Sequence, residues 1–206
     1  MDSSTRSSAR MSSVARREQL LDVATELAVQ RSFHSVSIEL IARSAGVTRA
    51  LVYQHFQDLG ALLEAVIERE MARALAQVSE TTPTDLGQGD ARQLMLDSLR
   101  SYLCAVRDHP ATWRLVLMPP EGAPTSLRKR IAHGRATVLA QLTQAVRPAV
   151  GPDVEGFDVE LSARILSAIS DEYARLVLTE PRRFSPERLL RHADWLLHLP
   201  DAGTPR

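Results

Sequence analysis

The fold of this chain is decided by residues 37–56, SIELIARSAGVTRALVYQHF, which contain two short amphipathic segments separated by a tight turn. Ser37 is placed to cap the first helix and Thr48 to cap the second. Gly46 supplies the turn of about three residues that joins such a pair. This is the spacing of a helix-turn-helix unit, whose second helix enters the major groove of DNA by its N-terminal residues.

The side chains at the start of the second helix suit contacts with DNA. Arg49 is the expected base reader because a guanidinium group matches the O6 and N7 acceptors of guanine, and Ala50 is small enough to approach a thymine methyl group. Tyr53 can donate a hydrogen bond to a phosphate. The same spacing also fits an ordinary turn between two core helices. The candidate DNA-binding residues are Ser37, Thr48, Arg49, Ala50, Tyr53 and His55.

Apolar residues recur at helical spacing on both sides of this unit, and no alternating strand pattern bounded by hairpin turns is present. The sequence therefore predicts an all-α fold of about nine helices. We expect helices at 13–31, 37–43, 48–56, 58–80, 90–108, 110–117, 125–147, 158–179 and 185–199. The cap of the 125–147 helix is expected at Thr125.

Turn-forming residues divide the chain. The stretch TTPTDLGQG at 81–89 has turn composition throughout and is the expected linker. The predicted organisation is a disordered tail at 1–12, a helix-turn-helix domain at 13–57, a connecting helix at 58–80, the linker at 81–89, a helical domain at 90–199 and a tail at 200–206.

The composition excludes several classes of protein. The 25 Lys and Arg residues balance 25 Asp and Glu residues, so any contact with nucleic acid has to be local. No apolar run approaches the roughly 18 residues of a membrane-spanning helix, and residues 1–12 lack the apolar core of a secretory signal. We therefore expect a cytoplasmic protein with no membrane partner. The single cysteine, Cys104, cannot form an internal disulfide.

Residues 17–65 resemble the N-terminal domain of the TetR (tetracycline repressor) family of bacterial transcriptional regulators. The residues in register are Ile41-Ala42, Ala45-Gly46-Val47, Thr48, Val52-Tyr53, His55-Phe56 and Leu62-Leu63. The resemblance implies a recognition helix at 48–56 and a homodimer that binds a near-palindromic operator. It also implies that 90–199 is a ligand-binding and dimerisation domain, that a small-molecule effector releases the operator, and that the last two helices, at about 158–179 and 185–199, form the dimer contact.

Three positions depart from the pattern of this family. Ser32 stands where the family usually has glycine after the first helix, which suggests a different turn there. Leu59 replaces the usual lysine that contacts a phosphate at the start of the fourth helix, which predicts weaker or less salt-sensitive binding. Glu39 is a conservative replacement of the usual aspartate. Arginines at 6, 10, 16 and 17 could compensate as a basic arm, or the tail arginines could be incidental.

A cavity in the C-terminal domain would lie between the helices that start at residues 90, 110, 125 and 158, because facing side chains build a cavity in a bundle. Each candidate lining residue also fits an ordinary core position. Asp171 and Glu172 interrupt the apolar pattern of their helix. They could pair with Arg175 on its surface, cross the dimer interface or meet a cationic ligand, and the surface position is the favoured expectation. The candidate ligand-binding residues are Tyr102, Trp113, Leu117, Met118, Val138 and Ile169.

The residues do not predict an enzyme. His109 follows Cys104, but no Gly-rich motif or nucleophile elbow accompanies them, and the histidines never form a metal-binding pair with a carboxylate. We expect no cofactor and no metal. The predicted function is a ligand-responsive DNA-binding regulator, with repression as the expected mode. The alternative is a helical small-molecule-binding protein without autonomous operator binding.

Overall fold

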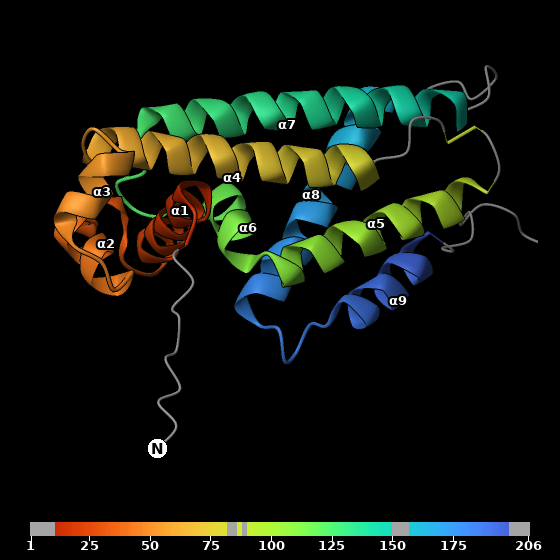
Figure 1. Cartoon of the computed structure of the whole chain (residues 1–206). Coiled ribbons are helices and arrows are strands. Elements are labelled where there is room, and N and C mark those ends of the chain that lie inside the picture. The colour runs from red at the N-terminus through yellow and green to blue at the C-terminus, as the bar shows by residue number, and fades with distance from the viewer. Residues whose placement is uncertain (1–10, 82–85, 88–89, 150–156, 198–206) are drawn as a thin grey trace, which may run out of the picture.

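The computed structural model describes residues 11–81, 86–87, 90–149 and 157–197, and the regular secondary structure of this part of the chain is helical throughout (Figure 1). The all-α prediction is therefore confirmed. Its nine α-helices and two short 3-10 helices are α1 (Ser13–Arg31), η1 (Phe33–Ser35), α2 (Ile38–Ser44), α3 (Arg49–His55), α4 (Leu59–Thr81), α5 (Ala91–Asp108), α6 (Pro110–Leu117), α7 (Thr125–Val146), η2 (Arg147–Ala149), α8 (Val159–Thr179) and α9 (Pro186–Leu196).

The first three helices form because each has an apolar stripe and a capped start. The Ser12 side chain accepts a hydrogen bond from the backbone N–H of Ala15 at the start of α1. Leu20, Leu21 and Ala24 on α1 are fully buried. They meet the fully buried Ile41 of α2, so the small domain closes around the inner face of α1.

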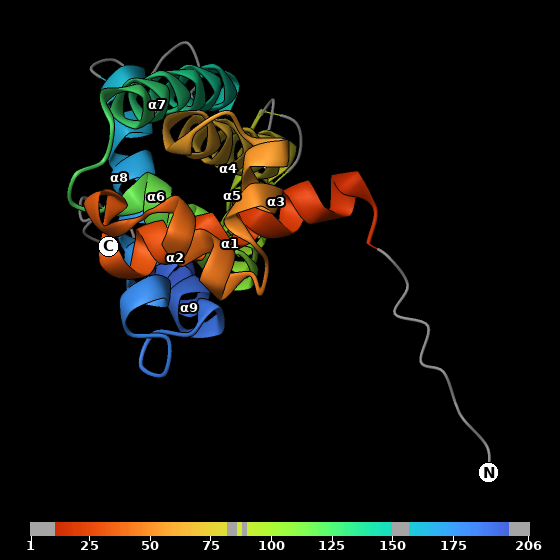
Figure 2. The same ribbon diagram turned by 60° about the vertical axis from the view of Figure 1, so that its left-hand side comes forward.

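The long helices α4 and α7 lie side by side along one edge of the molecule, which Figures 1 and 2 show from two directions. Arg130 on α7 pairs with Glu64 on α4 at 3.3 Å, and Gly134 packs near Met71 further along both helices. The two helices therefore run in the same direction. The start of α7 reaches the N-terminal domain.

The core of the N-terminal domain is not confined to that domain. Leu115 of α6 and Leu127 and Ile131 of α7 are buried in the same apolar cluster as Leu20 and Ile41. Leu115 is fully buried there, and Leu127 is 1% exposed. The N-terminal helices and the beginning of the C-terminal domain are thus packed around one shared core.

A second apolar core holds the C-terminal helices together. Leu103 and Val106 of α5 are fully buried against Trp113 of α6 and Val177 of α8. The guanidinium group of Arg114 on α6 donates to the backbone carbonyl of Leu178 on α8 at 3.1 Å. Helix α9 closes this core at the edge opposite to α4 and α7, as Figure 2 shows.

The predicted start of α7 and the predicted turn after α1 are wrong in detail. Pro124, not Thr125, stands at the cap position of α7, and no side-chain hydrogen bond forms there. The sequence suggested a different turn at Ser32, yet Ser32 has a φ of 108° and a ψ of 158°. This backbone conformation is one that glycine adopts and other residues rarely do. The serine therefore keeps the glycine-type turn, followed by η1, which the sequence did not predict.

Several predicted features lie outside the described residues. The tail at 1–12 is described only at 11 and 12, the linker at 81–89 only at 81, 86 and 87, and the tail at 200–206 not at all. The last helix was expected to reach residue 199, whereas α9 ends at Leu196 and the description ends at 197. Within the described ranges, no helix is long and apolar enough to cross a membrane.

Candidate nucleic-acid interface and internal cavity

Helices α2 and α3 are capped as the sequence predicted. The Ser37 hydroxyl accepts from the N–H of Leu40 at 3.1 Å, and the Thr48 hydroxyl accepts from the N–H of Leu51 at 3.3 Å. Between the two helices Gly46 has a φ of 67°, in the left-handed region that glycine tolerates. The capping oxygens are occupied, so each hydroxyl retains its hydrogen for an outside acceptor such as a phosphate.

The start of α3 presents its side chains outward. Thr48, Arg49 and Ala50 are exposed, while Val52 on the opposite side of the helix is fully buried. Arg49 forms no ion pair with any residue in the described ranges, so its guanidinium group is available to a ligand. Tyr53 is 54% exposed, so its ring and hydroxyl are accessible to a ligand.

The remaining candidate DNA-binding residue, His55, is half-buried at the end of α3. The structure thus gathers all six candidates on α3 and on the caps of α2 and α3, with five of them exposed.

Two residues of α1, Gln19 and Arg17, contact this unit directly, and Arg16 contacts Gln19; sequence reasoning did not single them out for this role. The Gln19 side chain donates to the backbone carbonyl of Ala45 in the turn at 3.4 Å, and Arg16 donates to Gln19 at 2.5 Å. The Arg17 guanidinium group lies 5.0 Å from the ring centre of Phe56. Arg16 and Arg17 therefore both contact other residues of the N-terminal domain.

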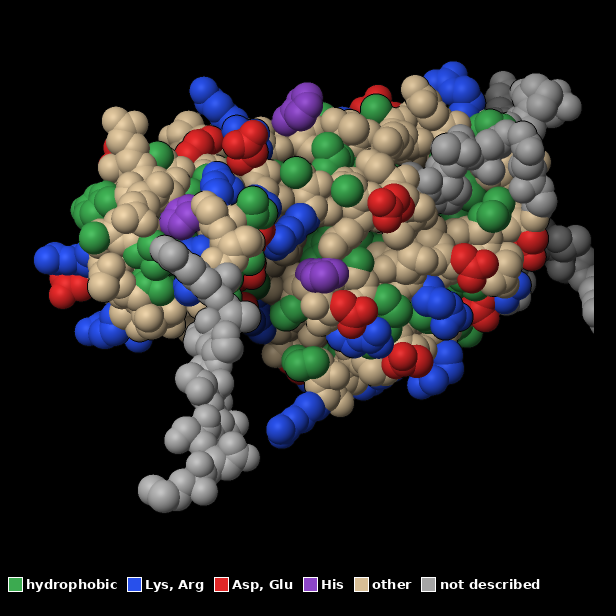
Figure 3. Space-filling view, viewed as in Figure 1, with side chains coloured by type: hydrophobic (Ala, Val, Ile, Leu, Met, Phe, Trp, Pro, Cys, Tyr) green, Lys and Arg blue, Asp and Glu red, His purple; other side chains and the backbone are tan. Residues whose placement is uncertain are grey.

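The start of α4 explains what Leu59 does in place of a lysine. Leu59 is half-buried and packs against the shared core, so it contributes apolar contact at this position. The Asp58 carboxylate accepts from the N–H of Ala61 at 2.7 Å and caps the helix. On the face of the molecule shown in Figure 3, basic and acidic side chains are intermixed.

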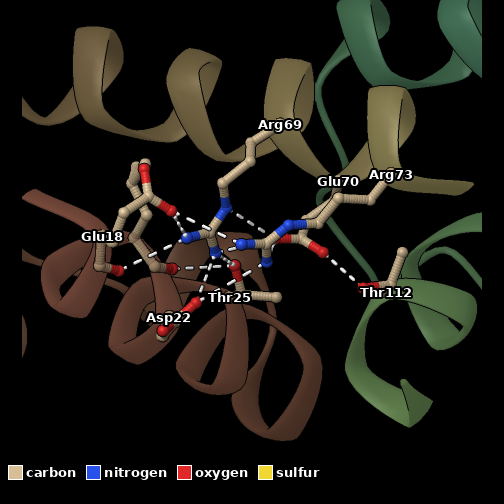
Figure 4. Close-up of polar contacts among 8 residues, drawn as sticks. Glu18, Asp22, Thr25, Arg69, Glu70, Arg73 and Thr112 are labelled. Atoms are coloured by element: carbon tan, nitrogen blue, oxygen red, sulfur yellow. Dashed lines mark hydrogen bonds and ion pairs between the residues drawn. The ribbon is translucent and has the colours of Figure 1, made fainter. Parts of the chain in front are cut away.

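A buried polar network joins the N-terminal domain to α6 (Figure 4). Glu70 on α4 is 2% exposed, and its carboxylate binds Arg69 at 2.7 Å and Arg73 at 3.2 Å. The Thr112 hydroxyl on α6 donates to the other oxygen of Glu70. A buried charge of this kind is stable only when it is paired and hydrogen-bonded.

Arg69 extends the network to α1. Its guanidinium group pairs with Glu18 at 2.8 Å and Asp22 at 2.9 Å, and donates to the Thr25 hydroxyl at 3.4 Å. Burial lowers the pKa of Arg69, but the hydrogen bond with Glu18 and the charges of Glu70 and Asp22 outweigh burial and raise it. Three helices from two domains therefore share one set of charges. In the sequence, the charged residue at position 70 within an apolar stripe indicates a buried acid, but it does not indicate the partners on α1 and α6.

A second contact between the domains involves η1 and the loop before α7. The N–H of Phe33 donates to the carbonyl of Glu121 at 3.4 Å. Gly122 has a φ of 75°, and a Cβ atom there would lie 2.2 Å from Cδ2 of His34. Glycine is required by both the backbone conformation and the close approach.

The C-terminal domain contains a cavity of about 210 Å³. It lies between α5, α6, α7 and α8, where the sequence placed it, and is also lined by α4 and by the end of α9. Five of the six candidate ligand-binding residues line it: Tyr102, Trp113, Leu117, Val138 and Ile169. Met118 does not line the cavity, because it ends α6 and packs against the second core.

Polar side chains meet at one part of the cavity wall. Asp171 lines the cavity with its side chain 23% exposed, and pairs with Arg135 at 3.4 Å and Arg175 at 3.8 Å. The expected pairing with Arg175 is found for both acids, and Glu172, which pairs at 3.3 Å, is exposed. Asp171 differs from the expected surface position because it is half-buried and lines the cavity. Tyr102 lines the same cavity and lies near enough to Asp171 for each to affect the pKa of the other.

Burial governs the protonation of this cluster. It raises the pKa of the Tyr102 hydroxyl far above its ordinary range, and the charge of Asp171 adds to this effect. Burial also raises the pKa of Asp171, against the opposing influence of Arg135 and Arg175.

The Tyr102 ring contacts the Trp113 ring edge-to-face, with centroids 4.9 Å apart. Within the described ranges, no three His, Cys, Asp or Glu side chains are grouped to hold a metal ion.

The comparison with known sequences identifies the N-terminal domain. Residues 20–66 match the family model of the bacterial regulatory proteins, tetR family. An HTH-type transcriptional regulator of Mycobacterium tuberculosis is 33% identical over 138 residues, which are 66% of this chain and 63% of that protein. The HTH-type transcriptional activator FasR of Mycolicibacterium smegmatis is 30% identical over 101 residues, 49% of this chain and 45% of that protein. The chain thus spans less than two thirds of these relatives.

The comparison with solved structures concerns the fold. A TetR-like transcriptional regulator from Rhodococcus sp. RHA1 matches with a TM-score of 0.73 and 19% identity, covering 91% of this chain and 96% of the other. FadR of Bacillus subtilis, solved in complex with stearoyl-CoA, matches with a TM-score of 0.64 and 18% identity, covering 87% and 96%. These relatives are named as transcriptional regulators, and residues 20–66 of the chain match the tetR family of bacterial regulatory proteins.

Proposed function

We propose that this protein is a ligand-responsive DNA-binding transcriptional regulator that acts in the cytoplasm. The observation that carries the proposal is the exposed Arg49 at the start of α3, which forms no ion pair with any described residue and lies in the segment that matches the tetR family model. Arg49 reads base edges in the major groove. The phosphates are contacted by the hydroxyls of Ser37, Thr48 and Tyr53 and by His55.

The binding unit is a homodimer formed by α8 and α9. Leu161, Ile165 and Ile169 lie four residues apart on α8 and are 53%, 51% and 37% exposed, and Trp195 on α9 is 59% exposed. An apolar stripe of this kind suits the face of a second helix pair. The dimer would place two copies of α3 about 34 to 36 Å apart, one turn of DNA, on a near-palindromic operator.

The cavity is the effector site, and the polar network links it to the DNA-binding domain. Trp113 lines the cavity, and Thr112 beside it donates to Glu70. An effector that shifts α6 therefore changes the contact that holds α4 and α1. In one conformation of the dimer the two copies of α3 have the operator spacing, and in the other conformation they do not. Coupling between the cavity and the DNA-binding residues requires two such states. We propose repression as the mode, with release by the effector.

Selection of bound fragments from random duplex DNA tests this function, followed by titration of the selected sequence at two salt concentrations. A palindromic consensus, bound by two chains as measured by light scattering, supports the proposal. A reporter gene behind that consensus gives the sign of regulation, since the relative FasR is named an activator.

The absence of any enriched sequence, at either salt concentration, contradicts operator binding by the protein alone. That result favours a helical small-molecule-binding protein, the function that Leu59 would suit because it packs into the core and brings no charge to a phosphate.

A further inference from the structure

We propose that Gly134 keeps a place open in the cavity wall for an apolar group of the ligand, against Met71 of α4. Gly134 is then a specificity-determining residue, because a side chain at this position would occupy the place of that group. The inference rests on the proposed function only in taking the cavity to be the effector site. It adds where an apolar part of the effector lies and which residues limit its size.

The packing of the protein does not require glycine at position 134. Gly134 lies inside α7, where glycine is less favourable than alanine, and it does not have the positive φ of Gly46 or Gly122. Among the described residues outside its own helix, a Cβ atom at Gly134 would have one neighbour within 4 Å, Cε of Met71 at 3.8 Å. This is an ordinary contact distance. Alanine would therefore fit, and glycine costs helix stability without a steric reason.

The space beside Gly134 belongs to the cavity. Gly134 and Met71 both line the cavity, and both are half-buried. Met71 ends in a flexible thioether, which can move to admit groups of different sizes. The unfilled position next to Gly134 is therefore a part of the cavity that lies between α7 and α4.

This part of the cavity is apolar, whereas other parts are polar. In the described part of α4 and α7, the lining side chains are apolar except Thr81 and Arg135. Arg135 pairs with Asp171 on α8, and Thr81 lies about 15 Å further along α4 than Met71. The polar lining residues of α5 and α8 are Ser98, Tyr102, Ser167, Ser170, Asp171 and Tyr173. These residues can meet a polar or charged part of the ligand, but the part beside Gly134 has to be apolar.

A group in this place would contact the core that the two domains share. Ile131, one turn before Gly134, lines the cavity and is buried in the same apolar cluster as Leu20 and Ile41. Met71 packs against this cluster and directly follows Glu70 of the polar network. The ligand group would therefore lie next to residues that hold the N-terminal helices.

The experiment uses the full chain and two uncharged apolar probes, benzene and butylbenzene, without DNA. Binding is measured by titration calorimetry. We expect butylbenzene to bind about tenfold or more tightly than benzene, because its alkyl chain fills the place beside Gly134. Binding of butylbenzene that is absent, or no tighter than that of benzene, overturns the proposal.

Two substitutions close this place. We expect butylbenzene binding to weaken about threefold to fivefold in Gly134→Ala and about tenfold or more in Gly134→Leu, as the added carbons displace the alkyl group. Without probe, Gly134→Ala should raise the unfolding temperature by about 2–4 °C, because alanine favours the helix. A glycine needed for packing would give a lower unfolding temperature. A lower unfolding temperature in Gly134→Ala, or unchanged butylbenzene affinity in Gly134→Leu, overturns the proposal.

Ala136 supplies the matched controls, because it is exposed on the same helix and does not line the cavity. Ala136→Leu adds the same side chain outside the cavity and should leave butylbenzene affinity unchanged. Ala136→Gly should lower the unfolding temperature by about as much as Gly134→Ala raises it, also without a change in affinity. Equal weakening of butylbenzene binding by Leu at 134 and at 136 contradicts a local role of Gly134.

A double-mutant cycle tests whether the group lies against Met71. Met71→Ala enlarges the same place from α4, so it should restore butylbenzene binding to Gly134→Leu by about threefold or more. Strict additivity of the two substitutions would put the alkyl group elsewhere and overturn the proposal.

Release of the selected operator is measured separately. Release by butylbenzene supports the effector role of the cavity. Butylbenzene binding that depends on Gly134 but does not release the operator contradicts that role, and it leaves the place of the apolar group established.

Discussion

Glu70 on α4 and Thr112 on α6 share a hydrogen bond inside the protein, at the point where the helix that carries the DNA-binding domain meets a helix that lines the cavity. The other oxygen of Glu70 binds the arginines that reach α1. A single carboxylate therefore joins the N-terminal helices, through Arg69 and Arg73, to a helix of the cavity wall.

The contribution of the polar network to the stability of the protein should come much more from its buried acid than from its exposed acids. Glu70→Ala leaves Arg69 partly buried with one carboxylate fewer, and we expect a loss of about 3 kcal/mol in the free energy of unfolding. Glu18 is 42% exposed, so Glu18→Ala should cost less than about 1 kcal/mol. Urea unfolding of both variants measures the difference. Equal losses would show that burial does not determine the contribution of each acid.

Arg49 and Tyr53 should affect DNA binding in different ways. Arg49→Ala removes the base reader, so it should cost about 1–3 kcal/mol at the preferred base and relax sequence preference there. Tyr53→Phe removes a phosphate contact and should weaken binding evenly across sequences. Competition binding with single-base operator variants separates the two effects. Unchanged discrimination by Arg49→Ala would show that another residue reads the bases.

Leu59→Lys should strengthen operator binding and steepen its salt dependence by about one unit per subunit, through one added phosphate contact. The methylene groups of the new side chain can keep the core contact of Leu59 while its amino group extends to the surface. Leu59→Gln is the uncharged control. Identical salt slopes for the Lys and Gln variants would show that position 59 does not face a phosphate.

Ser32→Gly should stabilise the protein by about 1 kcal/mol or more, because the φ of 108° at Ser32 is strained for any residue with a Cβ atom. Ser35→Gly, at the end of η1 where no positive φ occurs, is the control and should not stabilise. Thermal and urea unfolding compare the two. A stabilisation by both variants would point to a general effect of glycine in this segment.

Gly122→Ala should destabilise the contact between the domains by about 1–3 kcal/mol, since the new Cβ atom would overlap His34 and the backbone has a positive φ. His34→Ala in the same chain should recover the part that comes from the overlap. A double-mutant cycle in urea measures this coupling. Strict additivity would mean that the ring of His34 moves aside without cost.

The helices were predictable from the sequence because apolar spacing and caps such as Ser37, Thr48, Asp90 and Ser185 are local signals. The candidate DNA-binding residues followed from the same short stretch. Contacts between distant helices were not predictable, since nothing local links Glu70 to Thr112. Asp171 was assigned to the surface for the same reason: its partner Arg135 is on another helix.

The shared core has a consequence for engineering. Leu115, Leu127 and Ile131 cover the inner face of the N-terminal helices, so a fragment cut after residue 57 or after residue 80 would lose part of its own interior. The helix-turn-helix domain of this protein is therefore not a self-contained unit that can be transplanted onto another C-terminal domain. A working chimera has to carry α6 and the first half of α7 with the helix-turn-helix domain, and its junction belongs within α7 instead of in a loop.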